Sequence, residues 1–507
     1  MSVVSRNFEK IKGKIESVVP TGTLKGKVFR GGAWLGLGSF SEQAIRFARN
    51  MLLTRLLAPD AFGLMAMVLS ASTLIQVLVD VGAREALIQN PRGSEEGHVT
   101  ATWWMTVGRS FSIYAMVYVL APVAAHFYGH SELTPLARIA TLSIVFDGLM
   151  SPRAIVAMKE MKFTRVAIID NGGAICGVLI TVVLSLFFRD VWALVIGFCS
   201  ENAIRCILSF VLCPYRPRIP KDIAPFKDLL QFSKGMAGLA LLNLIFSRMD
   251  VFVLAKLFSE ADLGLYSMGI YLVQTPVTFL MRIIGQTIYP TFAHVQDNPA
   301  RGNRILLNLT SATLLLGLPV LVFLGFSGHS VLTVVYGARY GAAAIALILA
   351  ACAALLNVLN AQLTMVFYSQ GMPQLHRRAV AAMAVLVAVL TYPFAKAFGP
   401  WGAQLACLIA IIVGFGLQVE RVRKVTGLQL SEYRKVFLLP VAISLFAVLA
   451  CIGARSVDVL QRPLPNIAFG VLGCLTVLAI SGALVMREKK ATEQSNAVGR
   501  PAFEQQR

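Results

Sequence analysis

Long apolar stretches recur along almost the whole chain, and they constrain its fold more than any other feature. Read with a window of about 19 residues, they are long enough to cross the hydrocarbon core of a bilayer as helices. Fourteen such runs lie near residues 33–57, 61–88, 99–125, 134–157, 164–187, 191–213, 235–257, 263–289, 303–326, 342–369, 376–398, 400–419, 436–454 and 465–486. We therefore expect an all-α integral membrane protein with about fourteen transmembrane helices.

The composition excludes most classes of enzyme. Of the 507 residues, 56% are hydrophobic and 14% are charged, and the mean hydropathy is +0.69, whereas a soluble chain has about 25% charged residues. Fourteen spans leave no room for a large soluble domain. The sequence has no G-x-x-x-x-G-K-[ST] loop for ATP, and no set of nucleophile, base and oxyanion donors can be assembled from it. We expect a protein that is not an enzyme and has no cofactor.

The formal net charge of +20 is explained by the membrane and requires no nucleic acid. Lysines and arginines gather in both tails and in the connections that share their side, as cytoplasmic segments do. Residues 1–30 are basic and have no apolar signal segment. The other side of the membrane holds only Arg189, Lys256, Arg339, Lys396, Arg455 and Arg462. Both termini are therefore expected in the cytoplasm, as an even number of spans requires.

An internal repeat divides the chain. Residues 52–67 resemble residues 253–268 at an offset of 201, and each reads as a helix end, an acidic turn with glycine and a helix start. The repeat predicts two lobes of six helices related by a pseudo-two-fold axis along the membrane normal. The expected parts are a cytoplasmic segment (1–30), an N-lobe (31–213), a Pro-rich basic linker (214–234), a C-lobe (235–425), helices 13 and 14 (436–486) and a cytoplasmic tail (487–507).

Charged residues inside the expected spans indicate a polar interior, because each costs about 2.5 to 3.5 kcal/mol at the bilayer centre. Glu42, Arg46 and Arg49 share one face of the first helix. Their counterparts at the offset of 201 are Asn243, Ser247 and Asp250. Two such faces predict an aqueous cavity between the lobes; the simpler alternative is an ion pair between Glu42 and Arg46 near a helix end.

Other charged residues fall into three groups. The pairs Asp80 with Arg84 and Glu201 with Arg205 have i, i+4 spacing, which favours structural clamps or gates. Arg109, Arg138, Arg248 and Arg282 have no obvious helical partner, which makes them candidates for a diffuse anion site. Asp147 and Asp170 are isolated carboxylates that either carry a coupling H⁺ or Na⁺ or pair with an arginine. No metal site is expected, because the cysteines lack a C-x-x-C pair and His126 and His130 fall in a loop.

Several motifs together resemble one family of transporters. They are Leu57-x-Pro59-x-x-Phe62-Gly63, its weaker copy Leu263-Gly264-Leu265-Tyr266, the segment Asp80-Val81-Gly82, and Trp192-Ala193-Leu194. The chain resembles, from about residue 30 to 430, the oligosaccharide flippases (Wzx type) of the multidrug/oligosaccharidyl-lipid/polysaccharide exporter superfamily. The last two helices match that family in number only.

The resemblance implies a bacterial inner-membrane flippase for undecaprenyl-diphosphate-linked oligosaccharide repeat units of exopolysaccharide, capsule or lipopolysaccharide. The membrane lipids and the polysaccharide polymerase and export machinery would be its other partners. Arginine contacts suit a diphosphate, so we expect Arg46 and Arg49 as head-group ligands, with Arg109, Arg282 and Arg248 as further candidates.

Three alternatives stay open at the level of sequence. A lipid II flippase for peptidoglycan shares the helix number and a cationic cavity. A cation-coupled multidrug antiporter would need an acidic cavity; the arginines of the first helix disfavour it, whereas Glu42 and Asp250 keep it open. A scaffold in a polysaccharide assembly complex would tolerate charge changes in the cavity.

Overall fold

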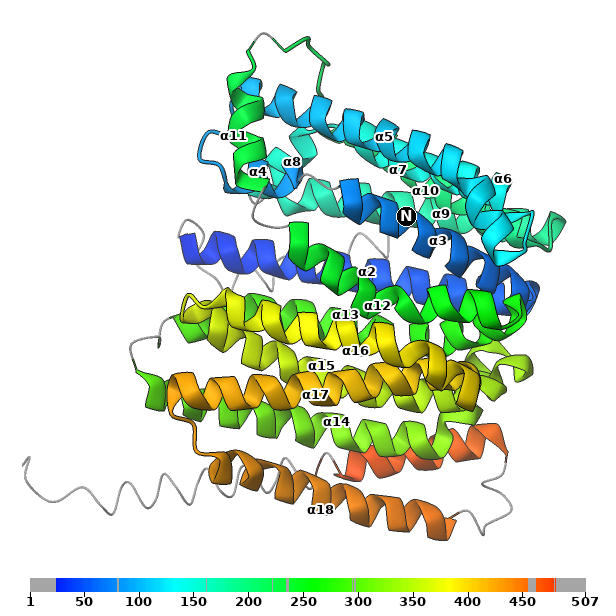
Figure 1. The fold of residues 1–507 in the computed structure, drawn as a ribbon, viewed down its shortest axis with the longest axis vertical. Coiled ribbons are helices and arrows are strands. Elements are labelled where there is room, and N and C mark those ends of the chain that lie inside the picture. The colour runs from blue at the N-terminus through cyan, green and yellow to red at the C-terminus, as the bar shows by residue number, and fades with distance from the viewer. Residues whose placement is uncertain are drawn as a thin grey trace, which may run out of the picture. The chain divides into compact units, whose positions relative to one another are not determined.

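The computed structural model describes residues 24–79, 82–160, 162–220, 222–233, 237–293, 295, 298–454, 462–477 and 479. Within these residues the regular structure is helical throughout, with no β-strand (Figure 1). A chain inside a bilayer has no water for its backbone groups, and a helix satisfies them within a single segment. The expected all-α membrane fold is confirmed in class.

The helices follow the apolar runs. In the first half of the chain they are α2 (Leu24–Leu56), α3 (Pro59–Val79), α4 (Ala83–Gln89), α5 (Glu96–Tyr128), α6 (Leu133–Ala140), α7 (Leu142–Leu149), α8 (Arg153–Lys159), α9 (Phe163–Phe187), α10 (Val191–Leu212) and α11 (Ala224–Ser233). In the second half they are α12 (Ala237–Leu257), α13 (Glu260–Ala293), α14 (Pro299–Tyr336), η1 (Ala338–Ala343), α15 (Ala344–Ser369), α16 (Pro373–Phe398), α17 (Pro400–Thr426) and α18 (Leu430–Ala454). A further apolar helix runs over Pro463–Val477.

The expected number of fourteen spans is not confirmed. Nine helices within the described residues are long and apolar enough to cross a membrane, or ten if α6 to α8 form one bent span. The helices α2, α12 and α13 are not among these nine.

Two runs expected as single helices are broken. The run 61–88 divides into α3 and α4, and Gly82 between them has a φ of 57°, a left-handed conformation that glycine adopts without strain. The run 134–157 bends by 63° between α7 and α8. Pro152 stands at that bend, where its ring cannot continue the preceding helix.

The chain divides into two compact units. One is Met1–Ser267 with Val387–Ala403, and the other is Met268–Leu386 with Gln404–Arg507. These units are defined by packing, whereas the expected lobes are bodies that move against each other. The lobe boundaries expected from the sequence therefore remain a prediction.

Within the first unit, two glycines of the internal repeat meet. A Cβ on Gly63 of α3 would lie 1.9 Å from the carbonyl oxygen of Glu260, and a Cβ on Gly264 of α13 would lie 1.8 Å from that of Pro59. The contact is reciprocal, because Gly63 and Gly264 are 201 residues apart, as are Pro59 and Glu260. Small residues let helix backbones approach this closely in membranes.

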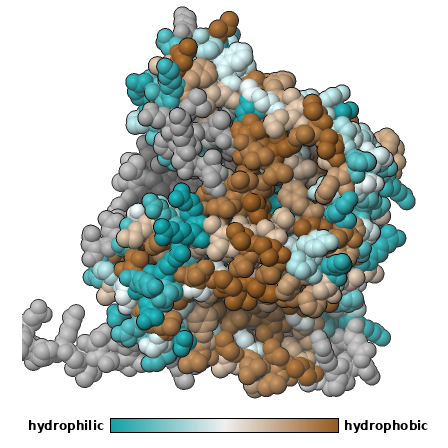
Figure 2. Space-filling view, viewed as in Figure 1, coloured by the Kyte–Doolittle hydropathy of each residue, from teal (hydrophilic) through white to brown (hydrophobic). Residues whose placement is uncertain are grey.

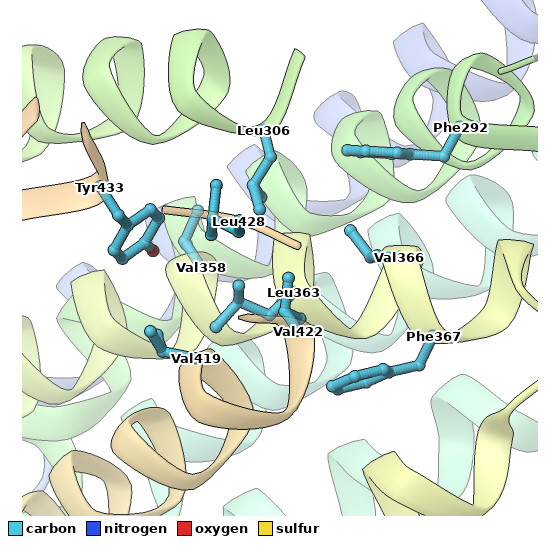
Figure 3. Close-up of a cluster of buried hydrophobic side chains, with 10 residues drawn as sticks. All are labelled: Phe292, Leu306, Val358, Leu363, Val366, Phe367, Val419, Val422, Leu428 and Tyr433. Carbon is cyan, nitrogen blue, oxygen red and sulfur yellow. The ribbon is translucent and has the colours of Figure 1, made fainter. Parts of the chain in front are cut away.

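The second unit is held by a cluster of ten buried side chains from α13, α14, α15, α17, α18 and the turn before α18 (Figure 3). Beside it lie buried polar groups of α15 and α17. The Gln418 amide donates to Asn360 Oδ1 at 3.1 Å and accepts from Thr364 Oγ1 at 3.2 Å. These hydrogen bonds satisfy both ends of the Gln418 amide where lipid offers no partner.

Large apolar side chains also cover the outside. Figure 2 shows hydrophobic residues over much of the viewed face. In the first unit, exposed positions on α5 and α9 include Val119, Val123, Leu179, Val183 and Phe187. An apolar surface of this kind is stable in contact with lipid tails. The chain is accordingly a multi-pass membrane protein.

We predict that Gly63→Ala and Gly264→Ala each destabilise the protein by about 1 to 3 kcal/mol, because the new methyl group overlaps a backbone oxygen and forces the two helices apart. Thermal unfolding of the purified protein in detergent measures the effect. Gly108→Ala on α5 is the matched control, since its Cβ would meet no atom within 4 Å. Equal melting temperatures for all three variants would contradict the tight contact.

Candidate functional site

Five charged side chains form a cluster inside the first unit. They are Glu42, Arg46 and Arg49 from α2, and Glu201 and Arg205 from α10. The helix α9 packs against both α2 and α10 (Figure 1). We call these five residues the arginine–glutamate cluster.

Glu201 is at the centre of the cluster. Its Oε1 lies 2.5 Å from Arg46 Nη2 and 3.2 Å from Arg205 Nη2, and its Oε2 lies 3.5 Å from Arg49 Nη1. Glu42 accepts from two of the same arginines, with Oε1 at 3.2 Å from Arg46 Nη2 and 3.0 Å from Arg205 Nη2. The Glu201 side chain is 2% exposed, whereas the other four are 17% to 21% exposed. The carboxylate is buried and the arginines surround it.

Glycines of α9 make room for this arrangement. A Cβ on Gly177 would lie 2.5 Å from the Cβ of Glu201, and a Cβ on Gly173 would lie 2.2 Å from the Cγ of Arg205. Gly173 and Gly177 are spaced i, i+4 on α9, and Glu201 and Arg205 have the same spacing on α10. Two glycines of one helix therefore face two charged residues of the next. The close packing of α9 and α10 therefore fixes where Glu201 and Arg205 stand.

The structure contains the expected pair of Glu201 with Arg205. It also contains the ion pair of Glu42 with Arg46, which the sequence analysis set as the simpler alternative to a face that lines a cavity. The sequence did not reveal that the two pairs meet, because 155 residues separate Arg46 from Glu201. The glycine spacing on α9 was the available signal, since small residues at i, i+4 mark a close helix neighbour.

Asp170 lies close to the cluster. Its backbone carbonyl oxygen is 3.5 Å from Arg205 Nη2. Its carboxylate is in electrostatic range of Arg205, Glu42, Arg84 and Arg46. The three arginines of the cluster thus have three carboxylates around them, counting Asp170.

Arg84, Arg109 and Asp147 come together at a second place in the same unit. They line a cavity of about 230 Å³ between α4, α5, α7 and α8. Arg84 and Asp147 are exposed and Arg109 is half-buried. The lining also includes Glu85, so acidic and basic groups are equal in number among these four residues.

The break between α7 and α8 shapes this cavity. Ser151 at the break donates its backbone N–H to Ser209 Oγ at 2.9 Å, and its hydroxyl donates to the carbonyl oxygen of Cys213 at 2.6 Å. Both partners belong to the end of α10. Polar groups freed by the break are therefore satisfied by a neighbouring helix.

The expected polar face of α12 is divided in the structure. Asn243, Ser247 and Arg248 are exposed. Asp250 is 8% exposed and accepts from the Tyr266 hydroxyl at 2.7 Å and from the N–H of Val251 at 2.8 Å. These residues of α12 thus have surroundings different from those of their counterparts on α2, which lie in the arginine–glutamate cluster.

Two predicted site residues lie outside what the structure describes. They are Asp80 and the side chain of Arg282, which belongs to α13. Among the described residues, no group of three or more His, Cys, Asp or Glu side chains is arranged to hold a metal ion.

Three proteins of polysaccharide synthesis are similar to this chain in sequence. Lipopolysaccharide biosynthesis protein WzxC of Escherichia coli (strain K12) is 23% identical over 63% of this chain and 65% of its own length. Succinoglycan biosynthesis transport protein ExoT of Rhizobium meliloti (strain 1021) is 23% identical over 62% of this chain and 63% of its own. Teichuronic acid biosynthesis protein TuaB of Bacillus subtilis (strain 168) is 21% identical over 66% and 69%. The chain spans less than two thirds of the length of WzxC and of ExoT.

Solved transporter structures share the fold. A lipid II flippase MurJ in an inward closed conformation matches with a TM-score of 0.73 over 90% of this chain and 99% of that chain, at 14% identity. An inward-facing multidrug resistance MATE family transporter of the MOP superfamily matches with a TM-score of 0.55 over 77% and 98%, also at 14% identity. Likeness at this identity concerns the fold alone.

The family comparison covers more than half of the chain. The profile of the family described as "Polysaccharide biosynthesis protein" matches residues 52–345. This range includes α10, with Glu201 and Arg205 of the cluster, and the cavity between α4 and α8. The chain therefore belongs to the polysaccharide biosynthesis protein family, with a fold like that of MurJ and the MATE transporters.

Proposed function

We propose that the protein is a flippase that moves undecaprenyl-diphosphate-linked oligosaccharide repeat units across the bacterial inner membrane. The products would serve exopolysaccharide, capsule or lipopolysaccharide synthesis. The family match and the relatives named for lipopolysaccharide, succinoglycan and teichuronic acid support this proposal. The relatives' names describe biosynthesis and transport, in keeping with a carrier that is not an enzyme.

The observation that carries the proposal is the set of three arginines gathered within one helical unit of a membrane protein. Arg46, Arg49 and Arg205 converge on the buried carboxylate of Glu201. Guanidinium groups bind phosphate oxygens in the same bidentate manner as they bind carboxylates. A site that already holds an anion between three guanidinium groups is chemically suited to a diphosphate.

The mechanism that we propose is alternating access of a cationic cavity between two six-helix lobes. Arg46 and Arg49 bind the diphosphate when the cavity opens to the cytoplasm, where both termini lie. Arg109, Arg248 and Arg282 provide further positive charge along the path. The polar head then crosses about 30 Å of hydrocarbon without losing its partners. H⁺ or Na⁺ coupling, if it operates, would involve carboxylates such as Asp147, Asp170 or Asp250.

A lipid II flippase is the second candidate function, because the MurJ fold extends over 90% of the chain. Its substrate carries the same polyprenyl diphosphate. An antiporter for cationic drugs is less well supported, since Glu42 and Glu201, the carboxylates of the cluster that a cation would need, are already paired with arginines.

Deletion of the gene identifies the substrate. We predict that a surface-polymer repeat unit linked to undecaprenyl diphosphate accumulates on the cytoplasmic side, where lipid mass spectrometry detects it. Accumulation of lipid II would assign the protein to peptidoglycan synthesis instead. Sensitivity to cationic drugs without any accumulated glycolipid would favour the antiporter and reject both flippase functions.

The arginines of α2 are tested by substitution in the complemented deletion strain. We predict that Arg46→Ala combined with Arg49→Ala lowers transport by about tenfold or more for each arginine removed, because each loses a charge-assisted contact with the diphosphate. Arg46→Lys with Arg49→Lys keeps the charges but loses the bidentate geometry, and we expect an intermediate loss. Export of the polymer at equal protein levels is the measurement.

The matched control for these substitutions is Arg153→Ala. Arg153 lies in the same unit, is exposed and pairs with Glu96, and we expect normal export from this variant. Normal export from the double alanine variant would refute the role of Arg46 and Arg49.

A further inference from the structure

Glu201 is the only carboxylate in the described residues that pairs with all three arginines of the arginine–glutamate cluster. Its Oε1 forms ion pairs with Arg46 and Arg205, and its Oε2 forms an ion pair with Arg49. Glu42 pairs with Arg46 and Arg205. Glu201 therefore connects the two arginines of α2 with the one of α10.

The charges of the cluster are balanced in this structure. Three guanidinium groups face the carboxylates of Glu42 and Glu201, and Asp170 is in electrostatic range of two of the three. An incoming diphosphate would meet arginines whose N–H groups are already directed at carboxylate oxygens. It can gain full contacts only by taking the place of a carboxylate.

Among these carboxylates, Glu201 is the one that a diphosphate has to replace at the α2 arginines. Its two oxygens are divided between Arg46 and Arg49, as two phosphate oxygens would be. Its burial at 2% exposure and the Gly177 contact keep it in place, so the arginines are held ready when no substrate is bound. Preorganised ligands of this kind lose little side-chain freedom on binding.

We propose that Glu201 is a positioning residue that acts as a built-in competitor of the diphosphate for Arg46, Arg49 and Arg205. This inference rests on the proposed function. The carboxylate orients the guanidinium groups in the empty site, gives them up when the diphosphate binds, and takes them back when it leaves. Competition lowers the affinity for the substrate and speeds its release, which a carrier needs in order to turn over.

Removal of the competitor tests the inference. We predict that Glu201→Gln lowers the Kd for undecaprenyl diphosphate by about tenfold or more, because an amide competes much less than a carboxylate for guanidinium groups. Isothermal titration of the purified full-length protein in detergent, with undecaprenyl diphosphate and separately with inorganic pyrophosphate, measures this. In reconstituted vesicles, KM and kcat for the lipid should fall together, whereas a purely structural role would not tighten binding.

A second variant covers the case in which Glu201→Gln alone does not fold. Glu201→Gln combined with Arg205→Gln removes one charge of each sign, so the net charge of the cluster is unchanged. Because Arg205 is itself a ligand of the diphosphate, this variant is compared with Arg205→Gln alone, and we expect it to bind more tightly than that single variant. Gel filtration and thermal unfolding report on folding. Glu96→Gln is the matched control, since it removes a carboxylate from an exposed arginine pair, and its Kd should equal that of the wild type.

The outcomes separate this inference from the proposed function. Tighter binding of undecaprenyl diphosphate by Glu201→Gln than by the wild type, or by the double variant than by Arg205→Gln, supports the competitor, with or without tighter binding of pyrophosphate. A Kd of folded Glu201→Gln equal to or above that of the wild type overturns it, as does a Kd of the double variant equal to or above that of Arg205→Gln. If the wild-type protein binds the lipid and Arg46→Ala with Arg49→Ala abolishes binding, the proposed function stands even where the competitor fails. Equal lipid binding by the wild-type protein and that double variant would reject the diphosphate site itself.

Discussion

A charge buried among membrane-spanning helices has to be paired, hydrated or neutralised, and this constraint decides the architecture of the first unit. Arg46 and Arg49 stand within a helix, and they are tolerated because α10 brings Glu201 to them. That approach depends on Gly173 and Gly177, where any side chain would displace Arg205 or Glu201. The small residues of α9 are therefore as important to the site as the charged residues that they accommodate.

The sequence was sufficient for the class of fold and for local pairs. Apolar runs predicted the helices because every membrane-spanning segment has to satisfy its own backbone. Spacing of i, i+4 predicted Glu201 with Arg205 and allowed Glu42 with Arg46 as the simpler alternative to a cavity-lining face, since both partners lie on one helix. The number of spans is not confirmed, because nine helices within the described residues, or ten with α6 to α8 as one bent span, have the length and apolarity that a span requires.

Tertiary contacts could not be predicted in the same way. The sequence around Asp250 does not indicate that this residue accepts a hydrogen bond from Tyr266. Nor does the sequence indicate that Arg84, Arg109 and Asp147 line one cavity. These contacts depend on where helices break and cross. Gly82 and Pro152 stand at the breaks within the runs 61–88 and 134–157, which the sequence analysis treated as single helices. The direction that the chain takes after such a break depends on partners elsewhere, such as Ser209 for Ser151. One fold also serves MurJ and MATE proteins, so specificity has to come from side chains.

The meeting point of Gly63 and Gly264 has a mechanical consequence. The two helix starts touch through backbone atoms, and neither glycine contributes a side chain to the contact. The spacing of the two helix starts is therefore set by the backbone itself, so a side chain of any size at either position would have to push them apart.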